Sequence, residues 1–362
     1  MINGLGIYTD LGGAILSPAV WAAMTEANAH AVDLPELLSS SGRCIAELVG
    51  AEAARVTPGA SAAIALATAA CIARGEGPAM ERLPDTTGLA ADVLVQRVQR
   101  SGDKYGRMAA LAGARLVEVD GAEGLERALG SGVAAAVFVP AHLDGVEGAV
   151  PLVEVARLAS AQGIPTLVDA AYLNYPPGTM SRFTKAGADL VCFSAKYFYG
   201  PNGGGFVAGR ADLVADVAAV DFTDYESGRW RTFGRPFKLD RHTVVGTAVA
   251  LEEWFELDHE GRWRSYERAV GKLERALAGL PGVTSAPRFL TMQETLEPHP
   301  VNCLLVTVAG GGAAEAQRAL RDGEPSIRVH LEGESLIVAV DAMRPDEVDT
   351  VARRLRAVLT QR

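Results

Sequence analysis

Short apolar runs alternate with segments of helical periodicity between about residues 45 and 250. A segment such as Leu152–Gln162 repeats apolar residues at helical spacing and ends before Gly163 and Pro165, which predicts a helix. Strands that are apolar along their whole length are typical of a parallel sheet covered on both faces. The pattern therefore predicts a doubly wound α/β domain. The expected strands are Arg115–Val119, Ala134–Val139, Pro165–Asp169, Leu190–Phe193 and Gly205–Ala208.

The pattern changes after Pro236. A long amphipathic helix is expected at Thr243–Asp258, followed by a small α+β domain. We therefore predict an N-terminal arm over residues 1–40, a large α/β domain over 41–240, and a linking helix with the small domain over 241–362. In the small domain we expect helices near Arg264–Leu280, Ala313–Leu320 and Pro345–Leu359, and strands at Leu304–Val308, Ser326–Leu331 and Ser335–Val340.

The composition and net charge of the chain exclude several classes of function. The chain has 362 residues, of which 49% are hydrophobic and 22% charged, as in a soluble globular protein. A net charge of −10 argues against nucleic-acid binding. The first residues lack the basic and apolar regions of a signal peptide, so we expect a cytoplasmic protein without a membrane segment. The four cysteines and six histidines lack CxxC, HxxH or HExxH spacing, which predicts no metal site.

A small-residue turn, Val56–Ser61, leads into the alanine-rich segment Ala62–Ala73. Backbone N–H groups at such a helix start can approach a phosphate, and the helix dipole favours its negative charge. Small residues are also ordinary at helix starts, so this turn by itself is a weak signal. It gains weight only beside other features.

Asp169 ends a predicted buried strand, at the edge where open α/β sheets bind ligands. A carboxylate there can keep the ring nitrogen of pyridoxal 5′-phosphate (PLP) protonated, which makes the ring an electron sink. A helix cap is the alternative for an aspartate in this place.

Lys196 lies between an apolar strand and the glycine-rich Pro201–Gly205. A partly desolvated lysine is more easily neutral, as Schiff-base formation with PLP requires. A snorkelling lysine on an edge strand is the alternative, but it leaves Asp169 unexplained. The turn, the aspartate and the lysine follow one another in the order expected of a PLP site.

Several segments resemble the fold-type-I PLP enzymes related to L-seryl-tRNA selenium transferase and D-glucosaminate-6-phosphate ammonia-lyase. The resemblance implies a mostly parallel seven-stranded sheet with helices on both faces and a smaller C-terminal domain. The segments that carry it are Ile2–Gly13, Val32–Leu37, Ile45–Ala53, Leu83–Gly88, Leu111–Val119 and Gly234–Lys238.

By that resemblance, Lys196 forms the Schiff base with PLP and Asp169 is the partner of the ring nitrogen. Phosphate contacts are expected from Gly59, Ala60, Ser61 and Ser194. The candidates for substrate binding are Thr9, Arg235, Lys238, Arg328 and His330. A basic cluster of Arg235, Lys238 and Arg241 can bind an anionic group or can simply be a solvated helix start.

The chain also departs from the family. Ser194-Ala195-Lys196 is one residue shorter than the usual Ser-Gly-Gly-Lys. Gln99 occupies the place expected for a histidine that stacks on the cofactor ring, and an amide cannot act as an acid or base at neutral pH. His330 falls near a family arginine, with Arg328 close by, so carboxylate recognition is expected to differ.

These features predict a PLP-dependent lyase that removes the α-proton of a small amino acid and eliminates or replaces a β-substituent. An aminotransferase, racemase or aldolase shares the same lysine, aspartate and phosphate loop. A tRNA-dependent seryl transferase and a non-catalytic protein on a PLP scaffold are further alternatives; the acidic charge disfavours the first, and Lys196 with Asp169 disfavours the second. The resemblance also implies a homodimer or larger homo-oligomer, with no nucleic-acid or membrane partner.

Overall fold

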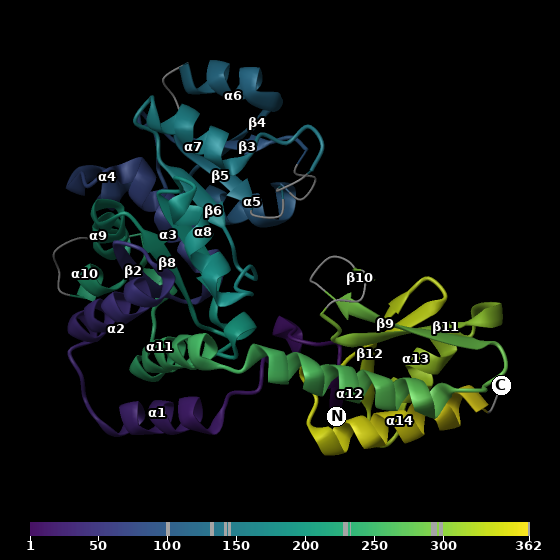
Figure 1. The fold of residues 1–362 in the computed structure, drawn as a ribbon. Coiled ribbons are helices and arrows are strands. Elements are labelled where there is room, and N and C mark those ends of the chain that lie inside the picture. The colour runs from purple at the N-terminus through teal and green to yellow at the C-terminus, as the bar shows by residue number, and fades with distance from the viewer. Residues whose placement is uncertain are drawn as a thin grey trace. The chain divides into compact units, whose positions relative to one another are not determined.

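The computed structural model describes residues 1–98, 102–130, 134–140, 143, 146–226, 231, 233–290, 295–296 and 300–360. The chain divides into two compact units. The large unit is Leu16–Glu256, and the small unit combines Met1–Ile15 with Leu257–Arg362 (Figure 1).

The large unit contains a seven-stranded sheet in the order β2-β8-β7-β6-β5-β3-β4. Neighbouring strands are parallel except at β8, which runs antiparallel to both β2 and β7. The predicted mostly parallel sheet is therefore confirmed. The strands are β2 (Ala53–Thr57), β3 (Asp92–Gln96), β4 (Arg115–Val119), β5 (Ala134–Pro140), β6 (Thr166–Asp169), β7 (Leu190–Ser194) and β8 (Gly205–Gly209).

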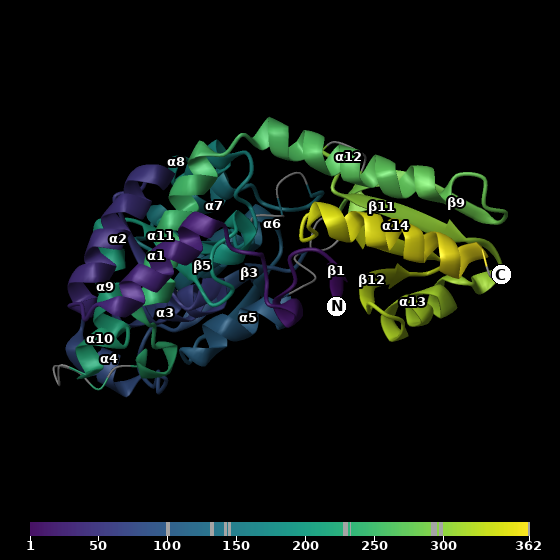
Figure 2. The ribbon, with the colours of Figure 1, turned by 90° about the horizontal axis from the view of Figure 1, so that it is seen from below.

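Helices cover both faces of this sheet (Figures 1 and 2). Along β7, Leu190 and Cys192 enter one core while Val191 and Phe193 enter the other, because successive side chains of a strand point to opposite faces. This explains why the strand is apolar throughout. The helices are α1 (Pro18–Ala29), α2 (Leu34–Val49), α3 (Gly59–Ala73), α4 (Gly77–Arg82), α5 (Gly102–Leu111), α6 (Gly121–Gly130), α7 (Leu152–Ser160), α8 (Arg182–Lys185), α9 (Ala211–Val220), α10 (Thr223–Glu226) and α11 (Arg241–Glu256).

The unit boundaries differ from those expected at residues 40 and 240. Helices α1, α2 and α11 belong to the large unit, because Val20, Leu38 and Val244 share one hydrophobic core with the sheet. Only the first 15 residues of the expected arm belong to the small unit.

The small unit contains a six-stranded sheet in the order β1-β12-β13-β11-β9-β10. The arm supplies β1, which pairs in parallel with β12. Strand β9, which was not predicted, contains Pro287 and is only partly buried, so its sequence lacks the usual strand signal. The strands are β1 (Ile2–Gly4), β9 (Val283–Leu290), β10 (Thr295–Leu296), β11 (Cys303–Val308), β12 (Ile327–Glu332) and β13 (Ser335–Ala339).

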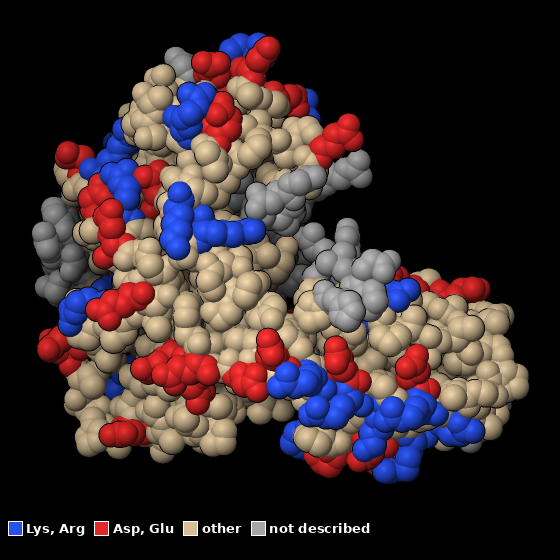
Figure 3. Space-filling model, in the orientation of Figure 1, with Lys and Arg blue, Asp and Glu red and all other residues tan. Residues whose placement is uncertain are grey.

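Helices α12 (His259–Leu277), α13 (Ala313–Asp322) and α14 (Pro345–Thr360) share one core with this sheet. Lys and Arg side chains gather over α12 and α14 on the face shown in Figure 3. Acidic side chains lie among them, and Lys272 forms an ion pair with Asp349. None of the described helices combines the length and apolar character needed to cross a membrane.

Candidate active site

Asp169 and Lys196 lie at the ends of two neighbouring strands. Asp169 is the last residue of β6, and its Cα is paired with that of Cys192 in β7. Beyond this pair, the Ser194 amide donates to the Ala171 carbonyl at 3.1 Å. A short 3-10 helix, Ala195–Phe198, then follows β7 and carries Lys196. Both residues therefore lie at the carboxyl edge of the sheet, where α/β proteins bind their ligands.

Asp169 is half-buried at the end of β6. Its Oδ1 accepts a hydrogen bond from the Ala171 amide at 3.0 Å, and no ion pair to it is formed by the residues that the structure describes. Burial raises the pKa of Asp169 to about 6, against the smaller lowering effect of the Ala171 hydrogen bond. A cationic ring N–H placed against this carboxyl would stabilise its ionised form.

A tyrosine ring lies beside the lysine and packs against a second tyrosine. The Lys196 Nζ lies 4.7 Å from the centroid of the Tyr197 ring. The Tyr197 ring meets the Tyr172 ring edge-on, with 6.2 Å between their centroids. Tyr172 lies in the loop after Asp169 and was not singled out from the sequence, because nothing local distinguishes it from a loop tyrosine.

The glycine-rich turn after Lys196 permits a close approach of three backbone segments. A Cβ on Gly205 would lie 2.6 Å from both the Gly59 carbonyl carbon and the Phe193 oxygen. The Ala195 amide donates to the Gly204 carbonyl at 3.0 Å. The turn therefore places the start of α3 directly against the end of β7.

The first turn of α3 is open to an anion. Its N-cap residue, Pro58, has no capping side chain, and the first turn contains no acidic residue. Gly59 has a φ of +80°, which glycine adopts without strain. Ala60 is buried, Ser61 is exposed, and the buried Ser194 pairs with Gly205 across the corner. The first N–H groups of a helix lack internal partners and favour negative charge.

These groups fit PLP. The cofactor has an aldehyde, a ring nitrogen and a phosphate. The corner formed by the ends of β6 and β7 and the start of α3 offers, in the same order, the Lys196 amine, the Asp169 carboxyl and a helix N-terminus. All three lie on connected elements of the large unit.

The other site residues that the sequence predicted lie on other segments of the chain. Gln99 lies outside the described residues. Arg235 lies with its guanidinium carbon 5.7 Å from the centroid of the Tyr225 ring, and Lys238 is exposed. Arg241 donates to the Ala27 and Asn28 carbonyls at 2.8 Å each. It therefore caps the C-terminal end of α1, which is a structural role.

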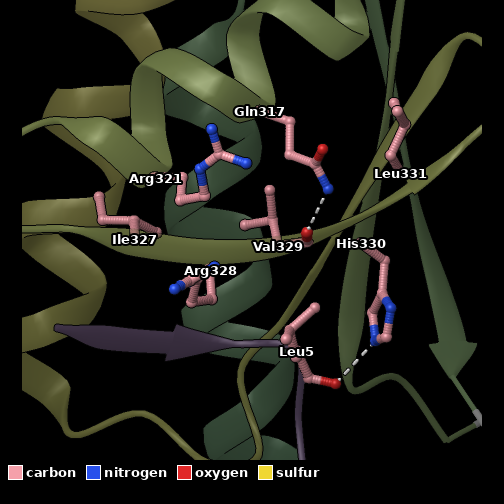
Figure 4. Close-up of a pocket in the computed structure, with 8 residues that line it drawn as sticks. All are labelled: Leu5, Gln317, Arg321, Ile327, Arg328, Val329, His330 and Leu331. Atoms are coloured by element: carbon pink, nitrogen blue, oxygen red, sulfur yellow. Dashed lines mark hydrogen bonds between the residues drawn. The ribbon is translucent and has the colours of Figure 1, made fainter.

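Thr9, Arg328 and His330 belong to the small unit. The His330 Nε2 donates to the Leu5 carbonyl at 2.9 Å, and its ring lies edge-on to Tyr8 at 5.0 Å. Arg328 is exposed on β12 and lines a cavity between the arm, α13 and β12 (Figure 4). Their role in substrate binding stays a prediction.

Comparison with known proteins identifies the family. Residues 122–303, half of the chain, match the aminotransferase class-V family. A 5′-C-glycyluridine monooxygenase-decarboxylase from a Streptomyces species is 32% identical over 97% of this chain and 88% of its own. The D-glucosaminate-6-phosphate ammonia lyase of Salmonella typhimurium is 28% identical over 78% of this chain and 74% of its own.

Two further comparisons agree. The L-seryl-tRNA(Sec) selenium transferase of Moorella thermoacetica is 27% identical over 98% of this chain and 80% of its own. A solved structure of D-glucosaminate-6-phosphate ammonia-lyase superposes with a TM-score of 0.84 over 99% of this chain and 95% of that chain, at 24% identity, which confirms the predicted fold. The predicted resemblance, enzyme class and cofactor are thus confirmed. The chain belongs to the aminotransferase class-V family of PLP-dependent enzymes.

Proposed function

We propose that this enzyme removes the α-proton of a small amino acid and expels a β-substituent, with Lys196 and Asp169 as its catalytic residues. One observation carries the proposal: Asp169 ends β6, and Lys196 follows the end of the neighbouring strand β7, beside an uncapped helix start. When bound, PLP supplies an electron sink that stabilises negative charge at the substrate's α-carbon.

Each residue has a defined part in this proposal. Asp169 keeps a proton on the cofactor's ring nitrogen, because a desolvated carboxylate is stabilised by an adjacent cation. The Lys196 Nζ anchors the cofactor and is the base that moves the α-proton.

The contacts to the phosphate come from one corner of the large unit. Gly59, Ala60 and Ser61 offer the free N–H groups of the first turn of α3, and Ser194 offers its hydroxyl. Gln99 remains our proposed contact with the face of the ring.

Lys196→Ala tests the assignment. We expect the variant to lose the visible absorption band of lysine-bound PLP, which borohydride removes from the wild type, together with turnover. Lys185→Ala is the matched control, because Lys185 is an exposed lysine of the same unit. A Lys196→Ala protein that keeps the borohydride-sensitive band would refute the assignment.

A second candidate is oxidative loss of the α-carboxylate. It is favoured by the 32% identical relative, whose name describes a monooxygenase-decarboxylase. A panel of amino acids separates the two reactions. Elimination releases ammonia and a keto acid, whereas oxidative decarboxylation consumes dioxygen and releases carbon dioxide.

We further propose that Arg235 and Lys238 bind an anionic group of the substrate or cofactor, and that Thr9, Arg328 and His330 contact the substrate.

We also propose that the enzyme is a homo-oligomer. Trp21 on α1 is 62% exposed, and a second chain packed against α1 would remove this apolar surface from water. Light scattering would measure the mass, and a monomer at micromolar concentration would contradict this proposal.

A further inference from the structure

Tyr199 has a backbone conformation that a bulky side chain rarely adopts. Its φ is +59°, in the left-handed region, and it directly follows the 3-10 helix that carries Lys196. Among the residues that the structure describes, Arg74 is the other non-glycine residue with a positive φ. Contact between the Cβ and the backbone makes this conformation unfavourable for tyrosine. It persists only where the surroundings hold the residue in it.

The left-handed turn at Tyr199 closes the segment that carries the lysine. The Gly200 amide donates to the Ala195 carbonyl at 2.8 Å. The Tyr199 amide donates to the Lys196 carbonyl at 3.3 Å. A left-handed residue after a helix allows the last carbonyl groups to accept bonds in this way. The conformation of Tyr199 therefore fixes the backbone on both sides of Lys196.

A buried tryptophan of α11 holds the Tyr199 ring. The rings of Tyr199 and Trp254 meet edge-on, with 5.6 Å between their centroids. Trp254 is buried, and its Nε1 donates to the carbonyl of the buried Asn174 at 2.9 Å. Asn174 lies in the loop that follows Asp169. One series of contacts thus joins the turn that carries Lys196 to the loop after Asp169.

A second aromatic contact joins the same two segments. The Tyr197 ring meets the ring of Tyr172, which lies in the loop after Asp169. Both of these tyrosines are half-buried, whereas Trp254 is part of the hydrophobic core. Because core side chains are closely packed and move little, the contact between Tyr199 and Trp254 restrains the two segments more strongly.

We infer that Tyr199 is a positioning residue, which holds the Lys196 turn at a fixed place relative to the Asp169 loop through its contact with Trp254. The inference rests on the proposed function, because it requires Lys196 and Asp169 to act on one PLP ring. An amine that meets the aldehyde while a carboxyl meets the ring nitrogen needs a fixed backbone. Glycine at position 199 would relieve the strain but would remove the ring that joins the segments.

Competition between Lys196 and methylamine for PLP tests this role in the PLP-loaded enzyme. Methylamine takes the place of the Lys196 amine on the aldehyde carbon, and the lysine is released as a free amine. Borohydride then fixes both forms, and PLP attached to the protein is separated from PLP attached to methylamine after denaturation. A well-placed lysine has a high effective concentration. We expect Tyr199→Gly to lower the methylamine concentration for half-displacement about tenfold.

Three further variants separate positioning from general stability. Tyr199→Phe keeps the ring and should stay within about twofold of the wild type. Arg74→Gly is the matched control, because it relieves a positive φ at an exposed residue after α3 and should leave the half-displacing concentration unchanged. Trp254→Phe removes the donor to Asn174 and should lower that concentration about threefold or more. It also provides the test if Tyr199→Gly does not fold.

Partial unfolding releases PLP from the protein but does not alter the half-displacing concentration of the PLP that stays bound. An unchanged concentration in either Tyr199→Gly or Trp254→Phe would overturn the inference. So would an equal decrease in Tyr199→Gly and Tyr199→Phe, or in Tyr199→Gly and Arg74→Gly. Failure of the proposed function is seen separately, as PLP that borohydride still attaches to the Lys196→Ala protein.

Discussion

Each unit holds a half-buried aspartate near the end of a strand, but the surroundings of the two carboxyl groups differ. In the large unit, Asp169 accepts one backbone hydrogen bond, and Lys196 lies in the 3-10 helix that follows the neighbouring strand. In the small unit, Asp341 lies beyond β13, and its Oδ1 has no hydrogen-bond partner in the part of the chain that the structure describes. The arm packs close to it, because a Cβ on Gly6 would lie 3.0 Å from that oxygen.

Burial raises the pKa of each carboxyl to about 6. Desolvation alone therefore does not mark a cofactor site. What distinguishes Asp169 is the lysine and the uncapped helix start of the same corner. A third carboxyl, that of the buried Asp221, is stabilised by an ion pair, because Arg55 supplies its countercharge from within the chain.

The strongest test of this comparison removes the countercharge of Asp221. The Arg55 Nε and Nη2 bind one Asp221 oxygen at 2.8 and 2.6 Å, and both residues are buried. We expect Arg55→Ala to lower the free energy of unfolding by about 3–5 kcal/mol, because an unpaired charge remains inside the protein. Chemical denaturation measures the change.

The surface pair of Arg157 and Glu154 provides the control, and Arg157→Ala should lower the free energy of unfolding far less than Arg55→Ala, because both of these side chains are exposed to water. Equal losses for the two variants would show that burial of the Arg55 pair contributes nothing.

Replacing Asp169 sharpens the contrast with Asp341. We expect Asp169→Ala to lower kcat by about 100-fold or more, because the ring nitrogen loses the group that keeps it protonated. The absorption spectrum of PLP bound to Asp169→Ala should also depend on pH in a different way from the spectrum of the wild type. In Asp341→Ala, the spectrum of bound PLP should keep its wild-type pH dependence, and a shift as large as in Asp169→Ala would remove the distinction between the two sites.

A side chain at Gly205 should disrupt the close contact between the start of α3 and the end of β7. We expect Gly205→Ala to cost about 1–3 kcal/mol in the free energy of unfolding and to weaken PLP binding, since the added Cβ meets backbone atoms. Gly203→Ala is the control, because a Cβ there meets no atom within 4 Å. The two variants can be compared by thermal unfolding and PLP titration; identical behaviour would contradict the close-approach argument.

The smallest effect is on the pH dependence of stability without PLP. Because folding raises the pKa of Asp169 from 3.8 to about 6, the ionised form is disfavoured in the fold, and stability falls as pH rises through this interval. Asp169→Asn avoids this penalty, so its stability relative to the wild type should increase between pH 5 and pH 8.

Adding PLP should reverse that advantage, because the cofactor then stabilises the ionised carboxyl. Asp341→Asn should be more stable than the wild type by the same amount with and without PLP. An Asp169→Asn protein that remains more stable than the wild type after PLP is added would argue against the Asp169 assignment.

The local sequence determined the strands of the large unit and the order of its chemical groups. Apolar runs bounded by Gly, Pro or Asp predicted five of its strands, and parallel strands place their carboxyl ends at one edge. The turn at Gly59, Asp169 and Lys196 could therefore be assigned to one region before any coordinates. These features depend on residues close together in the chain, and such signals are readable from a single sequence.

Only the tertiary structure decided which distant segments meet. It paired the arm with β12, placed Arg241 on the end of α1, brought Tyr172 to Tyr197 and formed the cavity around Arg328. It also decided that Asp169 is desolvated, because burial arises from helices packed on both faces of the sheet. Such contacts depend on long-range packing, which a strand or helix pattern does not encode.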